Sequence, residues 1–113
     1  MPGPLTITSD RFDGGIGLAL VGEIDLARSP DLRLRLREEV DAKPKRIVID
    51  LTKVTYMDSS GVATLVEALQ RAKASGTRLL LCGLQPKVRS IFTISRLDTV
   101  FEIAATADDA KAK

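Results

Sequence analysis

Short apolar runs that alternate with longer amphipathic segments constrain the fold of this chain most strongly. Three such runs, over 16–21, 46–51 and 78–82, are rich in Ile, Leu and Val and are too short to be buried helices. The longer segments between them have the spacing of helices with one apolar face. Strands joined by helices usually run parallel, so this alternation predicts a mostly parallel sheet with helices packed against it.

The N-terminal residues predict a hairpin that adds an antiparallel edge to this sheet. Leu5 to Thr8 alternates apolar and polar side chains, and Asp13-Gly14-Gly15 is a typical hairpin turn. The second strand, over 16–21, is apolar enough to be buried on both faces. We expect it to end at Gly22 and to be followed by a loop over 22–25.

The next segment predicts the first helix, over about 29–42. Ser29 is the expected N-cap, and Pro30 takes the first helical position. Strict alternation over 32–37 would also fit a strand, but the cap and the four-residue spacing of the buried stripe favour a helix. Leu34 falls off that stripe and is expected to be exposed. The neighbouring cations Arg33, Arg35 and Arg37 are expected to form a solvated surface without a single cationic face.

The second half repeats the strand-and-helix pattern. Residues 52–57 are expected to form a loop, followed by an amphipathic helix that is capped by Asp58 or Ser59 and ends near Ser75-Gly76 with a glycine C-cap. A third helix is expected to follow Pro86, and a last short strand lies over 100–103. The predicted fold class is α/β, with a mixed sheet of about five strands (a mostly parallel centre and an N-terminal antiparallel hairpin) and three to four helices. We expect one domain over 1–113, with flexible ends at 1–4 and 106–113, although the Ala-rich segment over 104–113 also fits a short helix.

Composition excludes several kinds of function. The chain has no His, which removes the commonest general base and metal ligand, so no catalytic residue, metal or cofactor is expected. The single cysteine, Cys82, forms neither an internal disulfide nor a zinc cluster and is expected to be a packed, inert thiol. A net charge of +2 argues against direct nucleic-acid binding. No apolar run approaches membrane-spanning length, so we expect no membrane insertion and a cytoplasmic protein.

The tetrapeptide Asp58-Ser59-Ser60-Gly61 carries the most chemical information. Asp and Ser are ordinary helix-capping residues, and capping alone explains them. Alternatively, a serine hydroxyl here accepts a phosphoryl group, which adds a charge of about −1.5 to −2. At a helix N-terminus that phosphate is expected to meet backbone N–H donors and a favourable dipole. It would also repel a partner that docks an acidic or apolar patch there.

Three stretches of the chain together resemble the STAS domain, and within that group the bacterial anti-sigma factor antagonists. They are Gly22-Glu23-Ile24-Asp25, the strand over 47–51 that leads to Tyr56-Met57-Asp58-Ser59-Ser60-Gly61, and the segment from Pro86 to Leu97. The resemblance extends over about 5–103. It departs from the family pattern at Val62-Ala63, where many members have Leu-Gly, and at Arg96, where many have Gly.

This resemblance implies a phosphorylation-controlled binding protein that is not an enzyme. The implied phosphoacceptor is Ser59, with Ser60 as the second candidate. The implied partners are a serine kinase that is itself the anti-sigma factor, and a metal-dependent serine phosphatase that reverses the modification. The kinase is bound when Ser59 is unphosphorylated and released when it is phosphorylated. Expected partner-binding residues are Asp25, Asp58, Ser60, Gly61 and Val62.

Two other functions stay open from the sequence. The first is a non-switching STAS adaptor subunit of a membrane transport complex for lipids or anions, in which Ser59 would be only a cap residue. The second is an enzyme of unknown type, which is the weaker reading because the chain lacks His and a phosphate-binding loop.

Overall fold

The computed structural model describes residues 4–113. Strands and helices alternate after an opening hairpin, in the predicted order. The elements are β1 (Thr6–Phe12), β2 (Gly15–Ile24), α1 (Ser29–Asp41), β3 (Arg46–Met57), α2 (Ser59–Ala74), β4 (Arg78–Cys82), α3 (Pro86–Ile94), the 3₁₀ helix η1 (Leu97–Thr99), β5 (Glu102–Ala104) and α4 (Ala107–Ala112).

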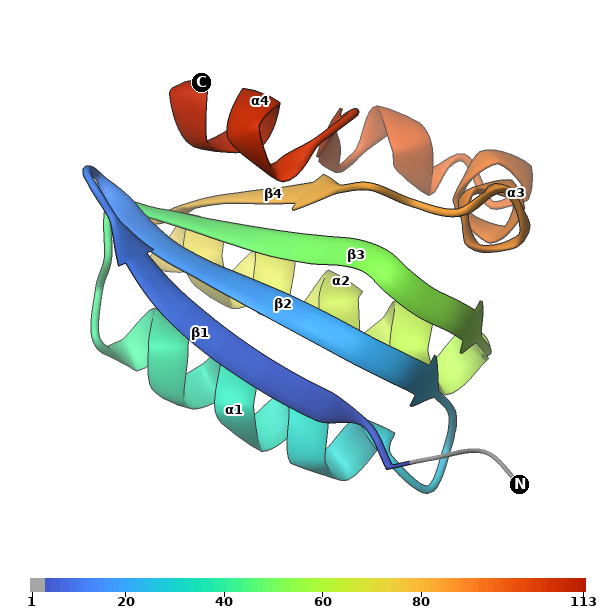
Figure 1. Cartoon of the computed structure of the whole chain (residues 1–113). Coiled ribbons are helices and arrows are strands. Elements are labelled where there is room, and N and C mark those ends of the chain that lie inside the picture. Colours follow the sequence, from blue (N-terminus) through green and yellow to red (C-terminus); the bar gives the residue numbers. More distant parts are fainter. Residues whose placement is uncertain (1–3) are drawn as a thin grey trace.

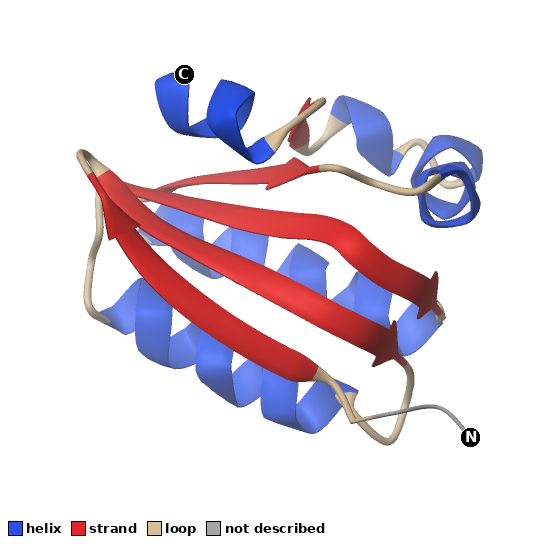
Figure 2. Cartoon of the chain, in the orientation of Figure 1, coloured by secondary structure: helices blue, strands red, loops and turns tan. Residues whose placement is uncertain are grey.

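A five-stranded mixed sheet in the order β1-β2-β3-β4-β5 forms the centre of the molecule (Figure 1). The β1–β2 pair is antiparallel, and every other neighbouring pair is parallel. Helices α1 and α2 cover one face of the sheet, and α4 lies on the other (Figure 2). The predicted fold class is therefore confirmed.

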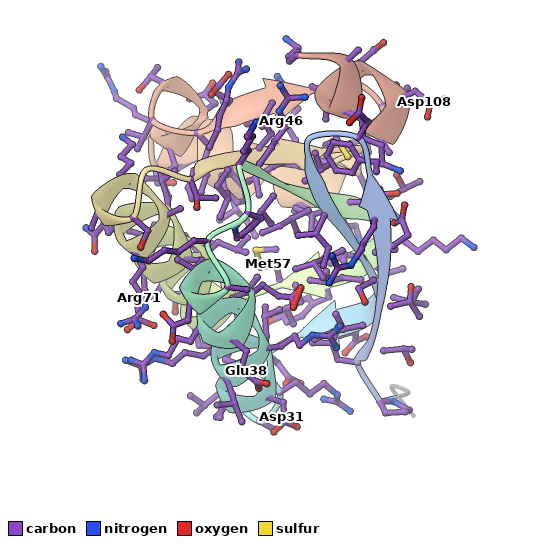
Figure 3. The ribbon with its side chains drawn as sticks, turned by 90° about the vertical axis from the view of Figure 1, so that its left-hand side faces the viewer. Asp31, Glu38, Arg46, Met57, Arg71 and Asp108 are labelled. Atoms are coloured by element: carbon purple, nitrogen blue, oxygen red, sulfur yellow. The ribbon has the colours of Figure 1, made fainter. Side chains whose placement is uncertain are left out.

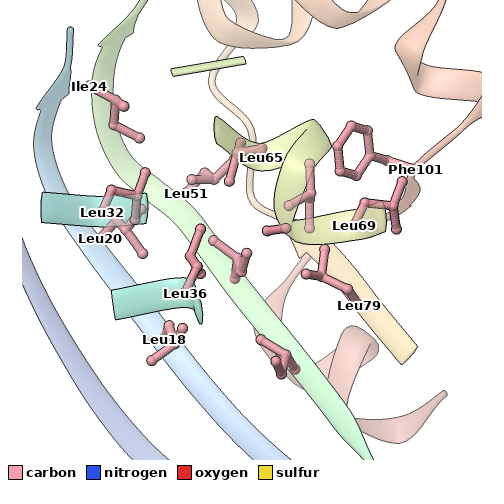
Figure 4. Close-up of a cluster of buried hydrophobic side chains, with 14 of the residues drawn as sticks. Leu18, Leu20, Ile24, Leu32, Leu36, Leu51, Leu65, Leu69, Leu79 and Phe101 are labelled. Carbon is pink, nitrogen blue, oxygen red and sulfur yellow. The ribbon is translucent and has the colours of Figure 1, made fainter. Parts of the chain in front are cut away.

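The main core lies between the sheet and helices α1 and α2 (Figure 4). Ile47, Ile49 and Leu51 point to this side from β3, because alternate residues of a strand share a face. Four-residue spacing supplies the matching stripe of α1, with Leu32, Leu36 and Val40 all buried. A smaller cluster under α4 contains Val48, Leu80, Cys82, Ala104 and Ala110.

Two segments predicted as loops belong to strands instead. Strand β2 continues past Gly22 to Ile24, and β3 continues through 52–57. The two extensions pair with each other, Glu23 with Tyr56 and Ile24 with Met57, which neither segment reveals alone. The pairing shifts register next to Gly22, whose φ of +124° suits a glycine. Gly22 therefore marks an irregularity within the strand, not its end.

Strand β2 is also less buried than predicted. Leu18 and Leu20 face the main core, but Val21 on the other side is 39% exposed. The second face of the sheet is covered by α4, a helix of only six residues. Burial on both faces was therefore the wrong prediction for the C-terminal half of this strand.

The first helix also begins differently from the prediction. The N-cap residue of α1 is Arg28, and Ser29 lies inside the helix with its side chain buried. Helix α2 ends close to the predicted position, with Ser75 as its C-cap and Gly76 at a φ of +75°. The last strand is shifted by two residues from its predicted start.

The C-terminal segment, expected to be a flexible tail or a short helix, forms a short helix. Thr106 caps α4 by accepting a hydrogen bond from the backbone N–H of Asp109 at 3.1 Å. Ala110 is fully buried against the sheet, so most of 106–113 packs on the domain. At the other end, residues 1–3 of the expected flexible segment 1–4 lie outside the described part of the chain.

Candidate functional site

The turn from β3 into α2 is held against the end of β2. The backbone N–H of Asp58 donates to the carbonyl of Ile24 at 3.2 Å. Gly61 lets the first turn of the helix approach this strand, because a Cβ there would lie 2.7 Å from Ile24 Cγ2 and 2.8 Å from Met57 Cγ. Residues distant in sequence therefore meet where the two parallel strands end.

Asp58 is the N-cap of α2, one of the two cap residues that the sequence left open. One of its carboxylate oxygens, Oδ1, accepts the backbone N–H of Ser60 at 3.0 Å and of Gly61 at 3.3 Å. The Ser60 hydroxyl donates to the same oxygen and is the largest cause that lowers the pKa of Asp58. Asp58 is therefore ionised at neutral pH and occupies the N–H groups that a phosphate was expected to meet.

The two adjacent serines have different surroundings. Ser59 is exposed, and its hydroxyl has no hydrogen-bond partner among residues 4–113. The Ser60 hydroxyl is half-buried between Asp58 and Ser29, whose Oγ lies 3.0 Å away. Of the two, only Ser59 therefore presents its oxygen to solvent, and its predicted exposure is confirmed.

Asp25 comes close to this pair of serines despite its distance in sequence. Ser29 Oγ lies 2.7 Å from the Asp25 carbonyl oxygen and 3.0 Å from Ser60 Oγ, so it bridges the β2–α1 loop and the start of α2. The Asp25 carboxylate accepts from Arg28, with 2.6 Å between Oδ2 and Nη1. Its negative charge is therefore balanced within the loop itself.

A groove of about 490 Å³ separates α1 from α2 beside these residues. Leu34 is 60% exposed, as the sequence predicted, and Leu26 is 75% exposed. The exposure of Leu26 was not predicted, although an apolar residue in a polar loop before a helix could have indicated a contact surface. The groove is lined by Leu26, Ser29, Pro30, Arg33, Leu34, Arg37, Ser60, Ala63, Thr64 and Glu67.

The expected partner-binding residues are less accessible than this groove. Gly61 is buried, and Val62 is half-buried against the main core. Asp25, Asp58 and Ser60 are also half-buried. The accessible surface at the start of α2 therefore consists of Ser59 and Ala63, with the two leucines Leu26 and Leu34 across the groove.

An ion-pair cluster ties the two helices together along the same groove. Arg33 donates two hydrogen bonds to the Glu67 carboxylate, at 2.6 and 2.8 Å, and Arg37 donates a third at 2.9 Å. Hydrogen bonding to Arg33, then to Arg37, lowers the pKa of Glu67 to about 2. These arginines share a partner on α2, which differs from the expected solvated surface.

Among residues 4–113, neither the cysteine thiol nor the carboxylates form a second site of chemical interest. Burial raises the pKa of the Cys82 thiol to about 12, so it stays protonated, as expected of an inert thiol. Across residues 4–113, no cluster of three His, Cys, Asp or Glu side chains is placed to hold a metal ion. In the same part of the chain, no helix has the length and apolar character needed to cross a membrane.

Comparison with known proteins agrees with this arrangement of sheet, helix and loop. A family model described as the STAS domain matches residues 7–110. This chain belongs to the STAS domain family. An anti-sigma-B factor antagonist of Listeria monocytogenes is 36% identical over 96 residues, which cover 83% of this chain and 82% of the relative.

Two solved structures show the same fold. An anti-sigma factor antagonist from Mycobacterium paratuberculosis has a TM-score of 0.88 at 26% identity, over 96% of this chain and 92% of that one. The Bacillus cell fate determinant SpoIIAA in its phosphorylated form has a TM-score of 0.73 at 21% identity, over 95% and 97%. The resemblance inferred from the sequence is therefore confirmed.

Proposed function

We propose that this chain is an anti-sigma factor antagonist that acts by binding, and that phosphorylation of Ser59 switches the binding off. The observation that carries the proposal is the exposed Ser59 hydroxyl, free of hydrogen bonds to residues 4–113, at the first turn of α2. Similarity to proteins named anti-sigma factor antagonists supports the class of partner. The proposed partner is a serine kinase that is itself the anti-sigma factor, and the proposed place of action is the cytoplasm.

The physical basis of the switch is negative charge added beside the ionised Asp58, at the edge of the surface where the partner docks. Asp58 is ionised and holds the N–H groups of Ser60 and Gly61, so a phosphate on Ser59 would stay in solvent. At an effective dielectric constant of about 20, one unit of the phosphate charge and an acidic group of the partner about 8 Å away repel by roughly 2 kcal/mol. Repulsion of that size weakens binding by about thirtyfold.

The docking surface follows from the groove next to the acceptor. Leu26 and Leu34 are exposed apolar side chains on the α1 side of the groove. Ala63, on the α2 side, is small and leaves room for a partner. Apolar anchors of this kind stabilise interfaces when a partner excludes water from them. Because Ser60 lines the groove and Ser59 adjoins it, a phosphate would lie at the edge of the contact.

Resetting the switch needs an enzyme, because phosphate monoesters hydrolyse very slowly in water. We assign this step to a metal-dependent serine phosphatase. The exposure of Ser59 leaves its phosphate open to attack without unfolding of α2.

Binding of Ser59 variants to the serine kinase of the same organism tests the proposal. The gene neighbourhood selects that kinase, and calorimetry or surface plasmon resonance gives the dissociation constants. Ser59→Ala is expected to bind like the unphosphorylated protein and to stay bound with Mg-ATP. Ser59→Asp is expected to bind about ten- to hundredfold more weakly, because it adds a negative charge beside Asp58.

Ser59→Asn is the matched control, since it has the size of Asp without the charge. Equal affinity of Ser59→Asp and Ser59→Asn for the kinase would contradict the charge switch. Stable association with transporter subunits, unchanged by either substitution, would favour the adaptor function instead.

A further inference from the structure

The outward face of α3 carries the most exposed large apolar side chain of residues 4–113. Ile94 is 84% exposed, whereas Val88 and Phe92 on the inward face are fully buried. Helix α3 lies beyond the end of β4, separate from the groove between α1 and α2 (Figure 1). A shallow groove of about 370 Å³ follows this face and is lined by Leu84, Pro86, Arg89, Ser90, Thr93 and Ile94.

Hydroxyl groups on and beside this face are already satisfied within the helix. Ser90 Oγ donates to the Pro86 carbonyl at 2.9 Å, and Thr93 Oγ1 donates to that of Arg89 at 3.1 Å. Ser95 Oγ donates in the same way to an α3 carbonyl, at 2.6 Å. A partner could therefore exclude water here without leaving these donors unpaired, which is the usual cost of covering polar side chains.

Three exposed cations lie on α3 or just after it. Lys87, Arg89 and Arg96 lie in a stretch, 84–97, that contains no Asp or Glu. None of the three forms an ion pair with a residue in 4–113. Arg96 also adopts a left-handed backbone conformation, with a φ of +61°, that is unfavourable for residues other than Gly. Arg96 therefore places an exposed cation at a position where the backbone favours glycine.

We propose that this surface, the α3 patch (Pro86, Lys87, Arg89, Ser90, Thr93, Ile94 and Arg96), docks a second protein partner. The partner presents an apolar pocket for Ile94 that is bordered by carboxylates. Carboxylates complement the three cations, and the internally bonded hydroxyls make the centre of the patch easy to desolvate. The proposal does not depend on Ser59, because no residue of the α3 patch lies at the start of α2 or in the groove between α1 and α2.

A protein fits this surface better than a membrane or a nucleic acid. Helix α3 has nine residues and exposes one large apolar side chain, far less than a helix that lies in a lipid interface. No aromatic side chain is exposed on α3 for base stacking, since Phe92 is its only aromatic residue and is buried.

Site-specific cross-linking followed by affinity measurement tests the α3 patch. The full chain, with photoreactive benzoylphenylalanine at position 90, one helical turn from an intact Ile94, is expressed in its own organism, and irradiation is expected to link it to a discrete protein. That protein is then purified, and its binding to the unphosphorylated wild-type chain is measured at low and high salt. Ile94→Asp and the double variant Lys87→Glu/Arg89→Glu are each expected to lose at least tenfold in affinity, and high salt is expected to weaken the wild type.

The matched control is Lys45→Glu/Lys73→Glu, which makes the same charge change at exposed positions outside α3. It is expected to bind within about twofold of the wild type, and thermal unfolding checks that all variants stay folded. Equal losses in the control and patch variants would overturn the proposal, as would cross-links only to this chain itself or no cross-linked protein. Ile94-dependent co-sedimentation with phosphatidylglycerol vesicles would show a lipid surface instead and would also overturn it.

Discussion

The hydroxyls of Ser59 and Ser60 lie next to each other at the start of α2 but have different surroundings. Ser60 is turned inward, where it donates to Asp58 and adjoins Ser29. Ser59, one residue earlier, is turned to solvent with no partner among residues 4–113. Because successive helical residues differ by about 100° in direction, only one of two neighbours can face the cap network. The same geometry makes Ser59 the better proposed acceptor.

This difference between the serines predicts different effects on stability. Ser60→Ala removes a hydroxyl that bonds the ionised Asp58 cap, so the free energy of unfolding is expected to fall by about 1 kcal/mol. Ser59→Ala is expected to change it by less than about 0.5 kcal/mol, because the side chain is exposed and unbonded. Urea denaturation of both variants measures the difference. A larger loss for Ser59→Ala would show that this hydroxyl is structural after all.

At this scale the sequence predicted some residues of the site and could not predict others. A cap at Asp58 or Ser59 follows from local patterns, because capping depends on neighbours within one turn. The structure shows that the cap is Asp58. Ser29 was misassigned as an N-cap, since its burial against Ser60 depends on a contact between residues 31 positions apart.

Helices α1 and α2 act as one unit on their face of the sheet because a shared carboxylate joins them. Glu67 of α2 accepts from both Arg33 and Arg37 of α1, at the edge of the groove that we propose as a docking surface. Four-residue spacing places the two arginines on the same side of α1. The cluster therefore fixes the width of the groove as well as the packing of the helices.

The lowered pKa of Glu67 predicts a pH-dependent contribution to stability. Its folded pKa of about 2 lies below the ordinary value of 4.5, so the contribution is complete above about pH 4.5 and disappears as pH falls towards 2. Glu67→Gln is expected to lower the free energy of unfolding at pH 7 by about 0.5–1 kcal/mol, a small value because both arginines are well exposed. Near pH 2 the variant and the wild type are expected to be equally stable.

Glu38→Gln is the matched control. Glu38 is an exposed residue of α1 (Figure 3). Its carboxylate forms no ion pair with a residue of 4–113. It is expected to change stability by less than about 0.3 kcal/mol at either pH. A Glu67→Gln loss that is as large at pH 2 as at pH 7 would attribute the effect to packing and not to charge.

Elements with their own periodic pattern were predictable, and elements that depend on distant pairing were not. The β4 strand and the helices α2 and α3 follow from apolar runs and helical spacing within the segments themselves. The extensions of β2 and β3 are irregular in sequence and form strands only because Glu23 pairs with Tyr56 and Ile24 with Met57. Tertiary pairing of this kind overrides local propensity.

The whole molecule brings its proposed switch to the end of the sheet where β2 and β3 terminate. The core between the sheet and helices α1 and α2 does not involve the Ser59 side chain, so a phosphate can be added without repacking. The proposed α3 patch lies on a different element from Ser59 and contains the cations Lys87, Arg89 and Arg96. In this proposal, one small domain carries two separate surfaces for two partners.

Mapping the phosphate directly tests the central claim that Ser59 alone accepts it. The purified chain is incubated with the serine kinase of its own organism and Mg-ATP, and tandem mass spectrometry locates the modified residue. The account predicts one phosphate per chain, on Ser59, and none on the Ser59→Ala variant while its Ser60 remains intact. Phosphate on Ser60, or a chain that the kinase binds but never modifies, would contradict it.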